Sequence, residues 1–160
     1  MTGDDKVKCP YVGLVPYTER DARFFFGRER EQRQIISNLF ASRLTILYGA
    51  SGVGKSSVLR AGVVRELENR IKNETAEEAS EPAVIYFNEW QGDALTRLKQ
   101  AIGALAVRFN NLSIPRGIGI HFDPSAPSGA AIDALPLRSV FKLVTTALNR
   151  DLFILLDQFG

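Results

Sequence analysis

The sequence is poor in the residues that build disulfides and protein-coordinated metal sites. It has one cysteine and one histidine in 160 residues, so it can form neither an intramolecular disulfide nor a Cys/His zinc site. Such sparing use of cysteine fits a reducing compartment. A chain of this length can bury about 70% of its unfolded surface. The sequence therefore indicates a fold that an ordinary apolar core stabilises.

An excess of charge of one sign and long apolar runs are also missing. Twenty Lys and Arg stand against eighteen Asp and Glu, for a net charge of +2, and the two signs are interleaved, which argues against a nucleic-acid-binding stripe. Residues 1–6 are polar and acidic with no apolar run behind them, unlike a secretory signal. The longest apolar runs are far too short to cross a bilayer. We therefore expect a soluble, cytoplasmic chain that binds neither nucleic acid nor membrane.

What the sequence does contain is an alternation of strand-like and helix-like segments. Short apolar runs predict three buried strands, at residues 44–48, 83–87 and 152–156. Apolar residues at helical spacing predict four helices, over residues 28–41, 55–72, 93–109 and 137–150. Loops are expected at residues 74–81 and 110–136. Strands that are apolar on both faces and alternate with helices are typical of a parallel sheet covered by helices, so the predicted class is α/β.

One motif carries specific chemistry. Residues 49–56 read GASGVGKS and match G-x-x-x-x-G-K-[ST], the Walker A or P-loop motif, between a predicted strand and a predicted helix. Its glycines let consecutive backbone N–H groups point at phosphate oxygens. Lys55 adds a positive charge near the β- and γ-phosphates, and the Ser56 hydroxyl can ligate Mg²⁺. The predicted nucleotide-binding residues are Gly49, Ala50, Ser51, Gly52, Val53, Gly54, Lys55, Ser56 and Ser57.

A second motif closes the chain. Residues 152–156 are followed by Asp157, which is the form of a Walker B strand, whose carboxylate holds Mg²⁺ directly or through water. We therefore predict Ser56 and Asp157 as the metal ligands. The alternative is that Asp157 caps a turn. Glu89 and Trp90 follow the second predicted strand at the same sheet edge, where ligands collect in α/β proteins.

These motifs, together with the start of the chain, resemble those of a known family. Residues 9–17 (CPYVGLVPY) and 21–29 (DARFFFGRE) resemble the segment that opens the novel STAND NTPase domain, and residues 49–57 and 155–159 extend the similarity over nearly the whole chain. STAND proteins are signal-transducing ATPases related to AAA+ and apoptotic NTPases. The resemblance implies a three-layer P-loop fold, ATP and Mg²⁺ as ligands, and a nucleotide-dependent switch. It also implies sensor, effector or repeat domains downstream, and self-association of the parent protein.

The resemblance adds two residues to the predicted site. Gly27, Arg28 and Glu29 resemble the family's Gly-Arg-Glu motif near the nucleotide base, so Gly27 and Arg28 are expected to bind nucleotide. From charge spacing alone, Arg28 is instead expected on a solvated face, paired with Glu29 and Glu31. The predicted organisation is a lead segment over residues 1–27 and a P-loop core over residues 28–160, which ends after Walker B without the family's sensor strand and helical lid.

The end of the second motif departs from the family pattern and leaves the reaction open. The family runs Asp-Gln-Phe-Glu-Glu, whereas this chain reads Asp157-Gln158-Phe159-Gly160, so the glutamate that would polarise the attacking water is absent and no catalytic residue is assigned. The leading interpretation is an ATP·Mg²⁺-binding segment of a signalling ATPase. The alternative is a nucleotide-binding regulatory module that does not hydrolyse. Another P-loop enzyme, such as a small-molecule kinase, is disfavoured because the sequence has no substrate-binding signature. GTP specificity is disfavoured because the sequence has no Asn-Lys-x-Asp stretch.

Overall fold

The computed structural model describes residues 15–73, 81–110 and 132–158. Most of the two predicted loops, and both Cys9 and His121, lie outside these ranges. The chain divides into two compact units, Met1–Arg65 and Glu66–Gly160. Each unit is described by itself.

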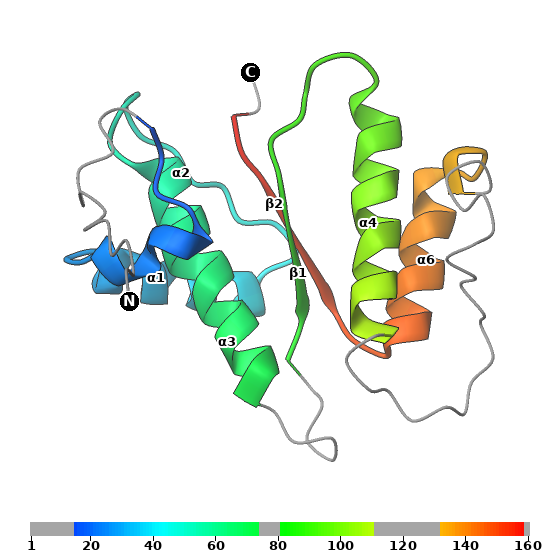
Figure 1. Cartoon of the computed structure of the whole chain (residues 1–160), viewed down its shortest axis with the longest axis horizontal. Helices are drawn as coiled ribbons and strands as arrows, with labels where there is room; N and C mark the ends of the chain where they lie inside the picture. Colours follow the sequence, from blue (N-terminus) through cyan, green and yellow to red (C-terminus); the bar gives the residue numbers. More distant parts are fainter. Residues whose placement is uncertain (1–14, 74–80, 111–131, 159–160) are drawn as a thin grey trace, which may run out of the picture. The chain divides into compact units, whose positions relative to one another are not determined.

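The first unit is helical. It contains the 3₁₀ helix η1 (Glu19–Phe24), α1 (Glu29–Ala41), the short α2 (Lys55–Ser57) and the π-helix η2 (Val58–Val64). Both α1 and η1 pack against η2 (Figure 1). The buried apolar side chains come from α1 and η2: Ile35, Ile36, Val58, Leu59, Ala61, Val63 and Val64. The helix predicted from the first apolar stripe is confirmed to within one residue.

The helix predicted after the phosphate-binding motif is confirmed, with an unexpected middle section. It comprises α2, η2 and α3 (Arg65–Asn73). In η2 the hydrogen bonds reach one residue further than in an α-helix, and the N–H of Arg65 donates to the carbonyl of Arg60. Single π-turns inside helices occur frequently at functional sites.

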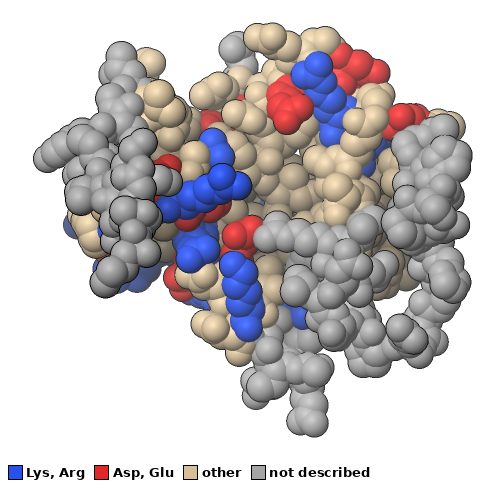
Figure 2. Space-filling view, in the orientation of Figure 1, with Lys and Arg blue, Asp and Glu red and all other residues tan. Residues whose placement is uncertain are grey.

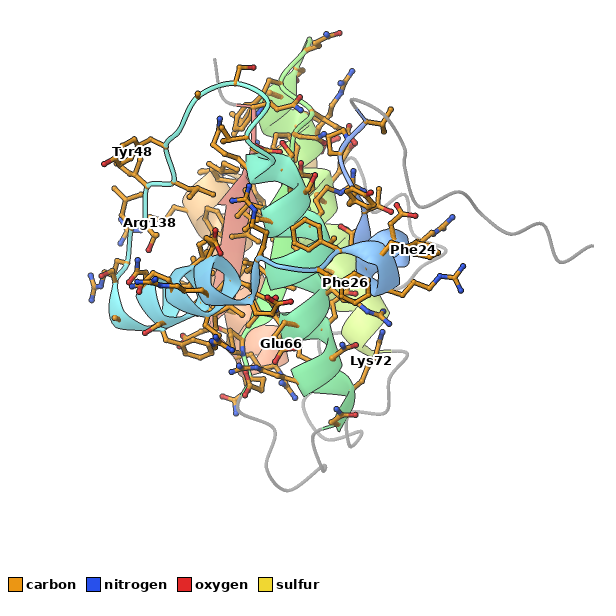
Figure 3. The ribbon with its side chains drawn as sticks, turned by 90° about the vertical axis from the view of Figure 1, so that its left-hand side faces the viewer. Phe24, Phe26, Tyr48, Glu66, Lys72 and Arg138 are labelled. Carbon is orange, nitrogen blue, oxygen red and sulfur yellow. The ribbon has the colours of Figure 1, made fainter. Side chains whose placement is uncertain are left out.

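The prediction of a buried strand at residues 44–48 is wrong. The segment has no strand hydrogen bonding, and Ile46 and Tyr48 are 74% and 89% exposed. Figure 3 shows Tyr48 pointing away from the ribbon. The physical reason is the lack of a partner, because the sheet formed by the described residues has only two strands and neither is this segment. Apolar, β-branched composition favours a strand only where a neighbouring strand and a packed face complete it.

The second unit holds the sheet. Strand β1 (Ala83–Phe87) pairs in parallel with β2 (Leu152–Leu156), with Ala83 opposite Leu152 and Phe87 opposite Leu156. Helices α4 (Ala94–Asn110) and α6 (Leu137–Leu148) connect them. Both predicted strands are confirmed at both ends, and the two helices to within two residues. The parallel pair with its connecting helices is an α/β arrangement, as the sequence predicts.

Helices α4 and α6 pack side by side against one face of the two strands (Figure 1). The inward-facing residues of β1 alternate, as a pleated strand requires, and they form a core with the two helices: Ala83, Ile85, Phe87, Ile102, Leu105, Ala106, Val140, Val144 and Leu148. Because the strands are parallel, both carboxyl ends reach the same edge. The residues after β1 therefore lie beside Asp157, which follows β2.

Charges of both signs are mixed on the surface that Figure 2 shows, where basic and acidic side chains lie next to one another. No helix formed by the described residues is long and apolar enough to cross a membrane.

Candidate functional site

The loop over residues 49–56 has the backbone shape that its glycines allow. Gly52 has φ +78° and Gly54 has φ +84°, in the left-handed region that is strained for residues with a Cβ. Gly54 also precedes the helix, and its carbonyl accepts the first helical hydrogen bond, from Val58 N at 2.9 Å. The backbone N–H groups in the first turn of a helix have no partner within the helix. The loop therefore opens onto a helix end suited to a phosphate.

Lys55 is folded back over this loop. Its Nζ donates to the carbonyl oxygens of Gly49 at 2.8 Å and Ala50 at 2.9 Å. The ammonium group therefore lies beside the first two residues of the loop. Two neutral carbonyl acceptors leave its charge uncompensated, so an incoming phosphate oxygen would gain a charge-assisted hydrogen bond.

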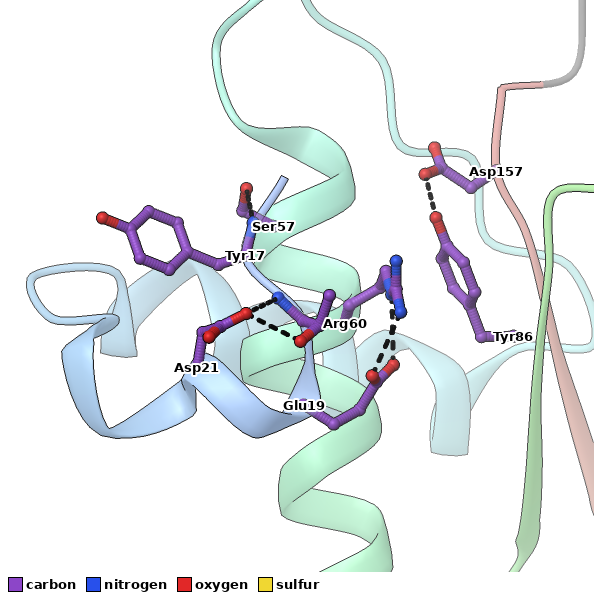
Figure 4. A network of polar contacts seen from close by, with 8 residues as sticks. Tyr17, Glu19, Asp21, Ser57, Arg60, Tyr86 and Asp157 are labelled. Carbon is purple, nitrogen blue, oxygen red and sulfur yellow. Dashed lines mark hydrogen bonds and ion pairs between the residues drawn. The ribbon is translucent and has the colours of Figure 1, made fainter. Parts of the chain in front are cut away.

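The segment before α1 contacts the helix that follows the loop. The backbone N–H of Tyr17 donates to the Ser57 hydroxyl at 3.1 Å, and Arg60 makes two 3.2 Å hydrogen bonds to the Glu19 carboxylate (Figure 4). A hydroxyl has one proton and two lone pairs, so Ser57 keeps its proton for another acceptor while it accepts from Tyr17. Sequence reasoning missed Tyr17, Glu19 and Arg60, because contacts 40 residues apart leave no local pattern.

Arg28 contacts both the loop and a neighbouring glutamate, whereas its predicted nucleotide binding stays a prediction. One guanidinium nitrogen donates to the carbonyl of Val53 in the loop at 3.1 Å, and another pairs with Glu31 at 3.2 Å. Gly27 adopts φ +81° and its N–H donates to the Glu29 carboxylate at 3.0 Å. Backbone N–H groups of Glu29 and Gly27 hold the pKa of the Glu29 carboxyl below its ordinary value. The Gly-Arg-Glu segment thereby lies against the phosphate loop.

Asp157 lies at the carboxyl edge of the sheet and is only 7% exposed. Its carboxylate Oδ2 accepts a hydrogen bond from the Tyr86 hydroxyl at 2.5 Å (Figure 4). Its carbonyl oxygen accepts from Trp90 Nε1 at 2.5 Å, and its N–H donates to the carbonyl of Phe87 at 2.9 Å. Trp90 was expected only to lie at this edge, and the role of Tyr86 left no signal in the sequence.

The described residues include oxygen donors of the kind that magnesium takes. Among the described residues, no cluster of three or more His, Cys, Asp or Glu side chains could hold a metal. Magnesium differs in that it is usually bound by one or two protein oxygens together with phosphates and waters. Ser56 in the first unit and Asp157 in the second each carry such an oxygen.

The structure brings the predicted residues together in two groups. The first unit unites Gly27 and Arg28 with the loop and Ser57. Asp157 belongs to the second unit, so a metal site shared by Ser56 and Asp157 stays a prediction.

A family model described as Novel STAND NTPase 1 matches residues 10–160. No solved structure matches the chain.

Proposed function

The chain belongs to the novel STAND NTPase family and is a nucleotide-binding NTPase module, and from that premise we propose that it binds ATP together with Mg²⁺. The loop backbone of residues 49–54, Lys55 and Ser57 would bind the phosphates. Gly27 at the end of the lead segment and Arg28 directly after it would border the nucleotide.

The observation that carries the proposal is the geometry of the loop. Left-handed Gly52 and Gly54, a helix starting at Lys55, and an ammonium group poised over the loop carbonyls are features that phosphate recognition requires together. A glycine-rich turn with another purpose would need neither the lysine over the loop nor the helix behind it.

Ser56 and Asp157 would hold the metal. When bound, Mg²⁺ neutralises charge on the β- and γ-phosphates. Ser56 would supply a neutral oxygen beside the phosphates, and Asp157 would supply a negative one at the sheet edge. The three-layer P-loop fold belongs to the same proposal, and the parallel pair of β1 and β2 with α4 and α6 against one face would supply two of its layers.

In the parent protein, this module would act as a nucleotide-dependent switch. Contacts between the lead segment and the loop helix support such coupling. Tyr17 donates to Ser57, one of the proposed phosphate-binding residues, and Glu19 pairs with Arg60 in the same helix. Downstream sensor or repeat domains, and self-association of the parent protein, would then respond to the bound nucleotide.

A second candidate function is nucleotide binding without hydrolysis. Gly160 stands where the family pattern has a glutamate, and no other residue is assigned to activate water. Steady phosphate release by the 160-residue chain, lost in Asp157→Ala, would exclude this candidate. Tight ATP binding with no release would support it.

Calorimetric titration with ATP and Mg²⁺ tests the binding proposal. Lys55→Ala is expected to weaken ATP binding by about tenfold to a hundredfold, because it removes a charged donor to phosphate. Lys72→Ala is the matched control, since it removes an exposed lysine at the end of α3 (Figure 3) and should leave the affinity unchanged. Equal affinity in Lys55→Ala and wild type would overturn the proposal.

A further inference from the structure

We propose that Tyr86 is a positioning residue that fixes the Asp157 carboxylate for magnesium, with Trp90 fixing the backbone of the same residue. The inference rests on the metal role of Asp157 in the proposed function. Neither Tyr86 nor Trp90 would touch the metal or the nucleotide. Their effect would pass entirely through Asp157.

Strand register places Tyr86 and Asp157 on the same face of the sheet. Ile85 and Phe87 point into the core with α4 and α6, so Tyr86, between them, points to the opposite face. Tyr86 pairs with Leu155, and Asp157 is two residues further along β2, on the face that Leu155 occupies. A long aromatic side chain can reach such a diagonal neighbour, and the phenol does so.

The chemistry of this hydrogen bond suits a metal ligand. The phenol takes Oδ2 and leaves Oδ1 for the metal or for one of its waters. Because tyrosine is a neutral donor, Asp157 keeps its negative charge for the cation, whereas a lysine or arginine partner would compete with the cation as a fixed ion pair. The bond restricts the carboxylate rotamer before the metal arrives.

The backbone of Asp157 is held independently of its side chain. The carbonyl of Phe87 accepts its N–H, and Trp90 Nε1 donates to its carbonyl oxygen. Trp90 is itself braced edge-on against Phe87, with ring centroids 5.1 Å apart. The next residue, Gln158, adopts φ +55°, so the chain turns directly after Asp157. Three groups from β1 and the residues after it thus fix one aspartate.

Magnesium titration of nucleotide binding tests the proposal without relying on turnover. A fluorescent ATP analogue is bound to the 160-residue chain in EDTA and then titrated with Mg²⁺. Tyr86→Phe keeps the ring and removes the hydroxyl. It is expected to raise the Mg²⁺ concentration at half-saturation about tenfold, the scale of partners that orient metal ligands, with the metal-free nucleotide affinity unchanged. Tyr48→Phe is the control, because it removes an exposed phenol hydroxyl.

A double-mutant cycle separates positioning from a general structural effect. If Tyr86 acts through Asp157, Tyr86→Phe causes no further shift in an Asp157→Ala background. A wild-type Mg²⁺ dependence in Tyr86→Phe, or the same shift in both backgrounds, would overturn the positioning role alone. An unchanged Mg²⁺ dependence in Asp157→Ala would instead show that the metal assignment itself has failed.

Trp90→Phe provides a second variant should Tyr86→Phe not fold. It keeps an aromatic ring against Phe87 and removes the indole N–H, and it is expected to shift the Mg²⁺ dependence in the same direction. Thermal melting of each variant establishes that it is folded. No shift in a folded Trp90→Phe would remove Trp90 from the proposal.

Discussion

At the scale of single residues, backbone freedom and charge placement decide what the loop can do. Gly52 and Gly54 sit at positive φ with open space around them, so their requirement is conformational and does not come from crowding. Lys55 differs from these glycines because its side chain is oriented by hydrogen bonds to the carbonyl oxygens of the loop.

Gly54→Ala tests the conformational requirement. A Cβ at φ +84° would contact nothing within 4 Å, but the left-handed conformation should cost about 1 kcal/mol of unfolding free energy. Nucleotide affinity should fall as the loop relaxes to another shape. Urea unfolding and ATP titration measure the two effects.

Gly62→Ala is the matched control for that substitution. Gly62 lies in the helix, and its Cβ would make ordinary contact with Gln32 at 3.6 Å, so the change should be neutral or stabilising by up to about 1 kcal/mol. Equal losses in the two variants would contradict the role given to positive φ at Gly54.

At the scale of elements, the ends of helices depend on specific caps. The carboxylate of Asp93 accepts the backbone N–H of Thr96 at 3.1 Å, in the first turn of α4. Hydrogen bonds from the side chain and the backbone of Thr96 lower the pKa of Asp93 from its ordinary value of 3.8. The ionised carboxylate is therefore the form that stabilises α4.

Asp93→Ala should lower the melting temperature at neutral pH. A carboxyl whose pKa is lower in the folded state stabilises the fold at pH values above its ordinary pKa of 3.8. This stabilisation is lost as the pH falls through the folded-state pKa. The difference between Asp93→Ala and wild type should thus shrink on acidification. Asp93→Asn, which caps about as well, should retain most of the neutral-pH stability. A gap that widens in acid would refute the assignment.

At the scale of the whole molecule, two segments of similar composition adopt different structures. Residues 44–48 (LTILY) and β1 (AVIYF) have comparable composition, but only β1 is paired and packed. An apolar segment without sheet hydrogen bonds should be among the least protected parts of a fold.

Amide hydrogen exchange measures that contrast directly. After correction for intrinsic rates, amides of residues 44–48 should exchange at least about tenfold faster than those of β1. The two segments serve as controls for each other because both are short, apolar and rich in β-branched or aromatic residues. Equal protection would show that residues 44–48 are paired as a strand.

The sequence by itself determined the elements whose signals are local. Apolar periodicity predicted α1, α4 and α6, and short apolar runs predicted β1 and β2, all to within two residues. The glycine and lysine spacing predicted a phosphate-binding loop at residues 49–56. Such patterns need only the covalent order of the chain, because a helix face and a strand face repeat at fixed intervals.

Only the tertiary structure decided which segments pair as strands and which side chains make long-range contacts. It left residues 44–48 unpaired, although their composition favours a strand, because sheet formation depends on a neighbour elsewhere in the chain. It also joined Tyr86 to Asp157 and Glu19 to Arg60 across 71 and 41 residues. Strand register and helix packing set these contacts, and no spacing in the sequence encodes them.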